Sequence, residues 1–221
     1  TGSSSEAAQR WAATYGTYAG RFRLDPGRAS HFSGTSKVHH GTDVLRRGQP
    51  RVAVKVMWRR EDWLREQAAR RSLGTGPLDP RYVVEIWDAL EVDQAERCKR
   101  EAKHGEVVDD SNPDGEFVIS MPLGDRGLND IITSEHQAGR SSIFAARVLW
   151  DVCRAVEHLH VERSLIHADV KPKNICRFDT IHKMIDMDGA AREGEAQAGR
   201  KPSPAYTPPE SSKQLFLLDC G

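Results

Sequence analysis

Cysteine is scarce in this sequence, and its copies lie far apart. The four cysteines are Cys98, Cys153, Cys176 and Cys220. No two of them form the C-x-x-C pair that zinc sites use, and four distant thiols in 221 residues do not make the disulfide framework of small secreted domains. A zinc site and a disulfide scaffold are therefore disfavoured. We expect a reducing, intracellular setting, in the cytoplasm or the nucleus.

Long apolar runs and an excess of charge of one sign are also missing. A membrane-spanning helix needs about 20 predominantly apolar residues, and the chain contains no such run. Its first residues, TGSSSEAAQRW, lack the apolar centre of a signal peptide. The 32 basic and 32 acidic residues give a formal net charge of zero, so no overall basic field favours nucleic acid. We expect neither a membrane span nor a nucleic-acid partner.

Alternation of apolar and polar residues predicts strands in the first half of the chain. In PRVAVKVMW, residues 50–58, the valines Val52, Val54 and Val56 recur at every second position. Further strands are predicted in FRLD, SKVHHGTDVL, RYVVEIWDALEV and GEFVISMPL. The segment REDWLREQAARRSL, residues 60–73, is rich in helix formers. This order predicts a sheet with one helix.

The second half begins with a helical pattern. Apolar residues that recur at three- and four-residue intervals predict a long helix with one buried face. They are Ala145, Val148, Leu149, Val152, Val156 and Leu159. Two short apolar segments that end in acidic residues follow, SLIHADV and HKMIDMDG. The prolines of GRKPSPAYTPPE then exclude a helix or a central strand.

The stretch SLIHADVKPKNICRF, residues 164–178, contains the polar residues that suggest chemistry. Asp169, Lys171 and Asn174 stand at fixed spacings in an apolar frame. An aspartate can orient a hydroxyl group, a lysine can stabilise a transferring phosphate, and an asparagine oxygen can bind a metal ion. The set therefore suits phosphoryl transfer. A polar turn, in which the aspartate and asparagine cap backbone groups, is the alternative.

Four motifs in this order, VAVK, HADVKPKN, IDMDG and YTPPE, resemble the eukaryotic protein kinase family. The resemblance covers about residues 20–212. It implies an α+β, two-lobed fold: a flexible lead-in at 1–20, an N-terminal lobe and hinge at 21–123 with an antiparallel sheet and one main helix, and a partial, mainly helical C-terminal lobe at 124–221. It also implies a serine/threonine-type protein kinase that uses ATP and Mg²⁺ to phosphorylate a protein substrate.

The resemblance assigns roles to the catalytic residues. Asp169 matches the aspartate that orients the substrate hydroxyl, and Lys171 matches the lysine that stabilises the transferring phosphate. His167 matches a histidine that packs in the core and orients this loop. Asn174 and Asp186 match the two metal ligands, and the apolar residues before Asp186 favour it over Asp188.

Further residues match the nucleotide-binding parts of the family. Lys55 matches the lysine that holds the α- and β-phosphates, and Glu66 is the best match to its helix partner, with Glu61 and Glu85 as competitors. EFVISMPLGDRGL resembles the adenine-binding strand and hinge. Backbone groups of Met121 and Leu123 would then meet the adenine edge, behind the back-pocket residue Ser120.

The phosphate-covering loop departs from the family's pattern. Ser33 and Val38 are expected beside the nucleotide, but His31, Ser33 and Ser36 occupy the three positions where the family has glycine. Glycine lets backbone N–H groups approach phosphates closely. We therefore expect weakened nucleotide binding, and a pseudokinase or scaffold that binds protein partners is the alternative function. A kinase fold acting on small molecules is disfavoured by SPAYTPPE, which resembles a protein-substrate platform.

Other departures fall in the catalytic and activation segments. Ala168 replaces an arginine that pairs with a phosphorylated activation segment, so we expect activity without that phosphorylation. Met187 and Asp188 replace a phenylalanine and a glycine. Ser203 stands where the family has a threonine that helps to position the catalytic loop, and Glu210 matches the acidic end of the activation segment.

The sequence stops about where the family's central C-terminal-lobe helix is expected. We therefore expect exposed apolar residues on the helix at 143–159, and a partner or a missing C-terminal region that completes this lobe. The chain also begins with Thr1. Both features favour a fragment of a longer kinase.

Overall fold

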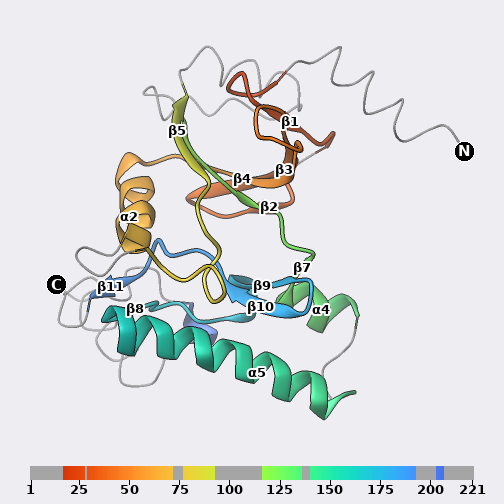
Figure 1. Cartoon of the computed structure of the whole chain (residues 1–221), viewed down its shortest axis with the longest axis vertical. Coiled ribbons are helices and arrows are strands. Elements are labelled where there is room, and N and C mark those ends of the chain that lie inside the picture. Colours follow the sequence, from red (N-terminus) through yellow and green to blue (C-terminus); the bar gives the residue numbers. More distant parts are fainter. Residues whose placement is uncertain are drawn as a thin grey trace, which may run out of the picture. The chain divides into compact units, whose positions relative to one another are not determined.

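The structure is a computed structural model that describes residues 17–27, 29–71, 77–92, 116–135, 140–192 and 203–206. The chain is α+β and divides into two compact units (Figure 1). The first unit comprises Thr1–Leu64 and Glu85–Leu123, and the second comprises Arg65–Val84 and Gly124–Gly221. Each unit is described by itself below. The lobe boundaries expected from the sequence stay predictions.

The first unit is built on an antiparallel sheet with the strand order β1-β3-β4-β6-β5, and β2 pairs with β3 at one end. The strands are β1 (Phe22–Leu24), β2 (His31–Phe32), β3 (Ser36–Asp43), β4 (Arg51–Met57), β5 (Asp88–Val92) and β6 (Glu116–Pro122). Helix α2 (Arg60–Arg71) follows β4. The predicted antiparallel sheet and its following helix are confirmed.

The core of the first unit lies on the valine face of β4. Val52, Val54 and Val56 are fully buried and pack with Phe22 and Val118. This is the face that period-2 alternation predicted. Tyr18 joins the same cluster and pairs with Phe22, so it is an exception to the flexible lead-in expected at residues 1–20.

The predicted strand RYVVEIWDALEV is wrong in its first half. Only Asp88–Val92 pairs with β6. Arg81 and Tyr82 lie in a turn, and Val83 and Val84 are buried in the second unit, where Val84 donates a hydrogen bond to the Met184 carbonyl. The valines therefore serve a different core from the one that β5 joins.

The second unit combines helices with short strands. Its helices are the end of α2, α4 (Leu128–Ser134) and α5 (Ser142–Glu157), and a π-helical turn, His158–Glu162, continues α5. Its strands are β7 (Arg126–Gly127), β8 (Leu165–Ile166), β9 (Ile175–Phe178), β10 (Ile181–Met184) and β11 (Ala191–Arg192). β10, β9 and β7 form one antiparallel sheet, and β8 pairs with β11. Two 3-10 turns, Pro172–Asn174 and Pro204–Tyr206, complete the described parts of this unit.

Helix α5 is confirmed, but its buried face is narrower than predicted. Leu159 and Ala155 are buried in the second core, whereas Leu149 is 63% exposed. Ile143 and Trp150 are also exposed, at 82% and 66%. The helix packs against β10 along one side, so apolar residues outside that side face solvent. The expected apolar exposure on this helix is thus confirmed.

No helix among the described residues has the length and apolar character needed to cross a membrane.

Gly41 on β3 generates a test of the first unit. A Cβ atom at this position would lie 2.7 Å from the Arg23 carbonyl oxygen on β1, whereas one at Gly34 would meet nothing within 4 Å. We expect Gly41→Ala to lower the free energy of unfolding by about 1–3 kcal/mol, because the strands must move apart. Urea denaturation checks this, with Gly34→Ala as the matched control. Equal stability of the two variants would contradict the close approach.

Candidate functional site

His167 fixes the loop that follows β8. Its side chain is buried, its Nε2 donates to the Ile185 carbonyl at 3.1 Å, and its Nδ1 accepts from the Asp169 backbone N–H at 3.3 Å. These two partners require a neutral ring that carries its proton on Nε2. Burial lowers the pKa of His167 and favours the same form. The structural role expected for this histidine is confirmed.

Two residues of this region have left-handed backbone conformations. Ala168 has φ 62° and Asp186 has φ 63°. An aspartate tolerates this region better than an alanine, for which it costs about 1 kcal/mol or more. Ala168 lies between His167 and Asp169, and the His167 side chain accepts a hydrogen bond from the Asp169 N–H. The loop therefore keeps a strained turn that directs Asp169.

The Asp169 carboxylate accepts hydrogen bonds from three side chains. Oδ1 accepts from the Ser203 hydroxyl at 2.8 Å, and Oδ2 accepts from Lys171 Nζ at 2.6 Å and from Asn174 Nδ2 at 2.9 Å. Burial opposes ionisation, but the hydrogen bonds from Lys171, Ser203 and Asn174 and the lysine charge outweigh it, so the pKa of Asp169 is lowered. An ionised carboxylate is a hydrogen-bond acceptor only, which suits it to orient a hydroxyl.

Lys171 and Ser203 also contact each other. Lys171 Nζ donates to Ser203 Oγ at 2.7 Å, so the ammonium, the hydroxyl and the Asp169 carboxylate form a closed triangle. A cation next to a hydroxyl and a carboxylate could stabilise charge on a phosphate that arrives there. The structure therefore brings together Asp169 and Lys171, and Ser203, which the sequence reasoning expected to help position this loop, contacts both.

Asn174 joins this triangle to the segment that contains Asp186. Its Nδ2 donates to the Asp169 backbone carbonyl as well as to the carboxylate, and its own carbonyl accepts from the Ile185 N–H at 2.9 Å. Within the described part of the chain its Oδ1 has no hydrogen-bond donor, which leaves an oxygen acceptor available.

Asp186 belongs to a group of three carboxylates. One oxygen atom from each of Glu66, Asp186 and Asp188 lies within 4.8 Å of the others. Glu66 is fully buried, and its Oε1 accepts from Arg70 at 2.8 Å and from the Met187 N–H at 3.2 Å. The sequence placed Asp186 at a metal site but gave neither Glu66 nor Asp188 a part in it. The D-x-D spacing was the signal for Asp188.

Arg70 is a site residue that the sequence reasoning missed. It lies four residues after Glu66 on α2, its side chain is buried, and it donates to both the Glu66 carboxylate and the Val84 carbonyl. The i, i+4 spacing of Glu66 and Arg70 was the available signal. A buried carboxylate needs such a partner, because desolvation otherwise destabilises its charge.

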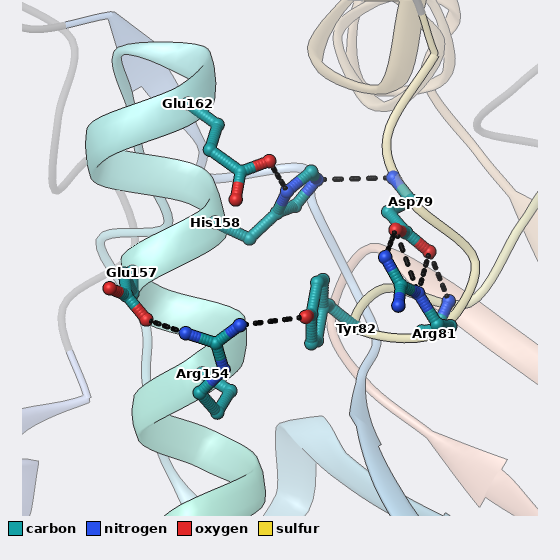
Figure 2. Close-up of polar contacts among 7 residues, drawn as sticks. All are labelled: Asp79, Arg81, Tyr82, Arg154, Glu157, His158 and Glu162. Atoms are coloured by element: carbon teal, nitrogen blue, oxygen red, sulfur yellow. Dashed lines mark hydrogen bonds and ion pairs between the residues drawn. The ribbon is translucent and has the colours of Figure 1, made fainter.

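Contacts with the end of α5 and the π-helical turn that continues it hold residues 79–82, as Figure 2 shows. His158 donates from Nδ1 to Glu162 at 2.8 Å and accepts at Nε2 from the Asp79 N–H at 3.1 Å. Tyr82 stacks on the His158 ring, with 5.1 Å between the ring centroids, and accepts from Arg154 at 3.2 Å. Since Val84 then binds both Arg70 and Met184, these contacts fix the end of α2 against β10.

Asp79, whose backbone N–H binds His158, has an ionised side chain. Hydrogen bonds from the Arg81 side chain lower the pKa of Asp79 to about 2 despite burial. The Arg81 side chain is 72% exposed, so its ion pair with Asp79 lies at the surface. The Asp79 backbone N–H, in contrast, donates to the buried His158 ring.

The nucleotide-binding residues expected from the sequence lie in the first unit, except Glu66. Lys55 is buried on β4, opposite Val38 on β3 and Ile119 on β6. Met121 is buried on β6, and the Leu123 N–H, expected to meet adenine, donates to the Arg51 carbonyl at 3.3 Å. The expected pair of Lys55 and Glu66 joins residues of different units and stays a prediction.

Ser33 has a local role in the loop between β2 and β3. Its hydroxyl accepts from the Ser36 N–H at 3.1 Å and lies 3.1 Å from the Ser36 hydroxyl, so it closes the turn. A glycine could not make these contacts. The expected contact of Ser33 with a nucleotide stays a prediction, as does that of Val38. Glu210 lies outside the described residues.

Comparison with known proteins supports a kinase-like character. No protein-family model matches the chain. Over 81 residues it is 32% identical to the human lymphokine-activated killer T-cell-originated protein kinase, an alignment that covers 34% of this chain and 25% of that protein. The aligned part thus spans a quarter of the length of the relative. The similarity is partial, and it agrees with the motifs that suggested phosphoryl transfer.

The acidic group fits a divalent cation by the chemistry of its donors. Mg²⁺ prefers oxygen ligands, and carboxylates supply them at Glu66, Asp186 and Asp188. Asp186 is tied to Asn174 through the Ile185 N–H. The two metal ligands expected from the sequence therefore belong to one hydrogen-bonded framework.

The strained backbone at Ala168 generates a stability prediction. Glycine adopts φ near 62° without the Cβ clash, so Ala168→Gly should raise the free energy of unfolding by up to about 1 kcal/mol. Ala155→Gly, within buried α5, should lower it by about the same amount or more. Thermal unfolding of both variants checks the pair. A loss of stability in Ala168→Gly would contradict the strained turn.

Burial of His167 generates a prediction about pH. Its pKa in the folded chain is below its ordinary value, so the unfolded chain takes up the proton first. The stability that neutral His167 contributes is full above about pH 6.5 and is lost as the pH falls towards the folded pKa, at no more than about 1.4 kcal/mol per pH unit.

Urea denaturation between pH 8 and pH 5 measures this loss. His167→Gln should reduce the slope of stability against pH. His40→Gln is the comparison variant in the first unit, because partial desolvation also lowers the pKa of His40. Identical slopes for wild type and His167→Gln would show that His167 does not titrate below its ordinary range.

Proposed function

We propose that this chain is the catalytic part of an ATP-dependent protein serine/threonine kinase with a two-lobed kinase fold. One observation carries the proposal: the ionised Asp169 carboxylate and the Lys171 ammonium already bind a hydroxyl group, that of Ser203, between them. A kinase must hold an acceptor hydroxyl in this way. The partial similarity to a protein named as a kinase supports the same conclusion.

Asp169, Lys171 and Asn174 each have a role in phosphoryl transfer. Asp169 accepts the hydrogen bond of the acceptor hydroxyl and orients its oxygen for attack in line with the leaving group. Lys171 offsets negative charge that develops on the transferring phosphate. Asn174 keeps the Asp169 carboxylate in place through its Nδ2, and its Oδ1 would be a ligand of a metal ion.

We assign Mg²⁺ binding to Asn174 and Asp186. When bound, the ion neutralises the phosphates and bridges them to the protein. Asp188 and Glu66 add negative charge next to Asp186, and the Arg70 guanidinium balances part of it. This balance suits a site that binds a cation and a nucleotide together.

Lys55, Ser33, Val38, Met121 and Leu123 are proposed as the nucleotide contacts. Lys55 would pair with the phosphates, and the Met121 and Leu123 backbone would meet the adenine edge. Two observations favour a second candidate, the pseudokinase or scaffold: the Ser33 hydroxyl closes its own turn, and the Leu123 N–H already has an acceptor. Both features weaken nucleotide binding unless those groups change partners.

A protein substrate is the proposed acceptor, and the apolar face of α5 is a further proposed contact. Ile143, Leu149 and Trp150 expose enough apolar surface to favour a covering partner or a further part of a longer chain.

Substitution of Asp169 tests the proposed activity. Asp169→Asn keeps the shape of the side chain but removes its charge, so transfer of phosphate from Mg-ATP to casein should fall by a factor of 100 or more, within the range of about 10²–10⁴ for general-base catalysis. Radiolabelled ATP measures the transfer. Asp179→Asn, an exposed aspartate after β9, is the matched control and should retain activity. Equal transfer by wild type and Asp169→Asn would remove Asp169 from the mechanism.

Thermal unfolding with and without Mg-ATP tests nucleotide and metal binding independently of phosphate transfer. A ligand at about 100 times its Kd adds roughly 2.7 kcal/mol to stability, so Mg-ATP should raise the melting temperature of the wild type but not that of Asp186→Asn. A cooperative transition with no shift in the wild type would favour the scaffold.

A further inference from the structure

Helix α5 presents a stripe of exposed residues at a regular spacing. The exposed fractions in this stripe range from 43% for the Arg154 side chain to 82% for Ile143. Steps of four and three residues alternate along it, which gives a mean period of 3.5 residues. This is the period at which one helix contacts another along its length. The members of the stripe are Ile143, Arg147, Trp150, Arg154 and Glu157, and Val161 continues the spacing in the following π-helical turn.

Apolar and charged residues are mixed in the stripe. Trp150 lies near its middle and is 66% exposed, and Ile143 and Val161 lie at its two ends. The charged members differ in sign: Arg147 lies in the first half of α5, and Glu157 is the last residue of the helix. The stripe is therefore not a uniform apolar patch, and its order of charges selects the orientation of a helix that covers it.

A second copy of α5 that runs antiparallel matches the charges of the stripe. In a two-fold symmetric pair centred on Val152, a residue faces the position that lies equally far on the other side of the centre. Arg147 lies five residues before this centre and Glu157 five after it, so the two would form an ion pair between the copies. Trp150 and Arg154 lie two residues before and after it, which places a cation next to an indole ring. Symmetry forms each contact twice.

The ends of the stripe match in the same arrangement. Ile143 and Val161 each lie nine residues from the centre, so an apolar side chain at one end of the stripe would meet its counterpart from the other end. These are the two most exposed large apolar side chains in the described part of the chain. The pairing would remove both from water, which is favourable.

A parallel pair of the same helices is disfavoured by charge. Each residue would then face its own copy, so two arginines would meet at position 147 and again at position 154, and two glutamates at position 157. Like charges that face each other across an interface cost free energy. The antiparallel orientation avoids all three repulsions.

The contacts that these charged groups make within one chain leave capacity for a second partner. Arg147 Nε lies 3.3 Å from Asp151 Oδ1, and a guanidinium has five N–H donors in total. Glu157 Oε2 accepts from Arg154, and a carboxylate can accept about four hydrogen bonds. The ion pair between the copies therefore adds to these contacts and does not require their loss.

We propose that α5 joins two copies of this chain in an antiparallel, two-fold symmetric dimer through this stripe. The inference builds on the α5 contact proposed above, for which it names the occupant, and it does not depend on phosphoryl transfer. A helix of 16 residues is about 24 Å long, so the pair forms a small interface. Small interfaces belong to weak or transient complexes, and the dimer should therefore dissociate on dilution.

Sedimentation equilibrium of the 221-residue chain over a range of concentrations tests the dimer. The mean mass should rise from that of one chain towards that of two and stop there. Trp150→Ala should weaken the dimer by about tenfold or more, because large aromatic residues near the centre of an interface dominate affinity. Leu149→Ala is the matched control. Leu149 is 63% exposed on the same helix but lies about 100° around it from Trp150, so its substitution should leave the dimer in place.

The mass of one chain at every concentration would overturn the inference, because the exposed face of α5 would then serve another partner. A mass that continues to grow beyond two chains would also overturn it. Equal dimerisation of the wild type and Trp150→Ala would place the interface elsewhere.

Charge reversal tests the antiparallel register. Arg147→Glu or Glu157→Arg alone should lose the dimer, because each variant places like charges opposite each other in both halves of the interface. A mixture of the two variants should dimerise again, since every facing pair then has opposite charges. Thermal unfolding confirms that each variant is folded. Folded variants that stay monomeric after mixing, while the wild type dimerises, would contradict the arrangement.

Casein phosphorylation in the same samples separates this inference from the proposed function. A dimer with the expected response to charge reversal, but without phosphate transfer, would support the inference and overturn the kinase activity. Transfer by a chain that stays monomeric at every concentration would do the opposite.

Discussion

A partly buried carboxylate, that of Asp169, is the constraint around which the second unit's site is organised. Its charge can remain only where donors replace the water that it loses. Lys171, Asn174 and Ser203 supply those donors from three positions of the chain: the loop after β8, a 3-10 turn and the distant segment at 203–206. The need to satisfy one negative charge thus brings together a cation, an amide and a hydroxyl, which is also the set that phosphoryl transfer uses.

Glu66, which is more deeply buried than Asp169, also needs donors that replace the lost water. It is fully buried, and the Arg70 guanidinium and the Met187 N–H compensate its charge. Arg70 in turn binds the Val84 carbonyl, and the residues before Val84 contact Arg154 at the end of α5 and His158 in the following π-helical turn. The carboxylate group next to Asp186 is therefore supported by a continuous chain of contacts from α2 to α5. A change in that anchor would alter the charge balance at the proposed metal site.

The sequence predicted those parts that depend on local pattern. Alternating valines indicated β4 and its buried face, and the spacing of Asp169, Lys171 and Asn174 indicated a phosphoryl-transfer loop whose members do contact one another. Features that depend on tertiary environment were not predictable. The valines Val83 and Val84 look like strand residues but are buried in the other unit's core, and no local pattern distinguishes the two outcomes. The i, i+4 spacing of Glu66 and Arg70 indicated a possible ion pair, but other charged residues surround Glu66 on α2, so the spacing did not show that both side chains are buried.

Strained backbone conformations lie next to Asp169 and at Asp186. Ala168 and Asp186 both hold positive φ angles, which persist only where surrounding contacts determine the backbone. His167 supplies such contacts at both places, because it binds the Asp169 N–H and the carbonyl of Ile185, the residue before Asp186. One buried, neutral ring therefore fixes the turns that direct two different carboxylates. Acceptors that are positioned before a ligand arrives need little reorganisation during the reaction, and this is the property that electrostatic catalysis requires.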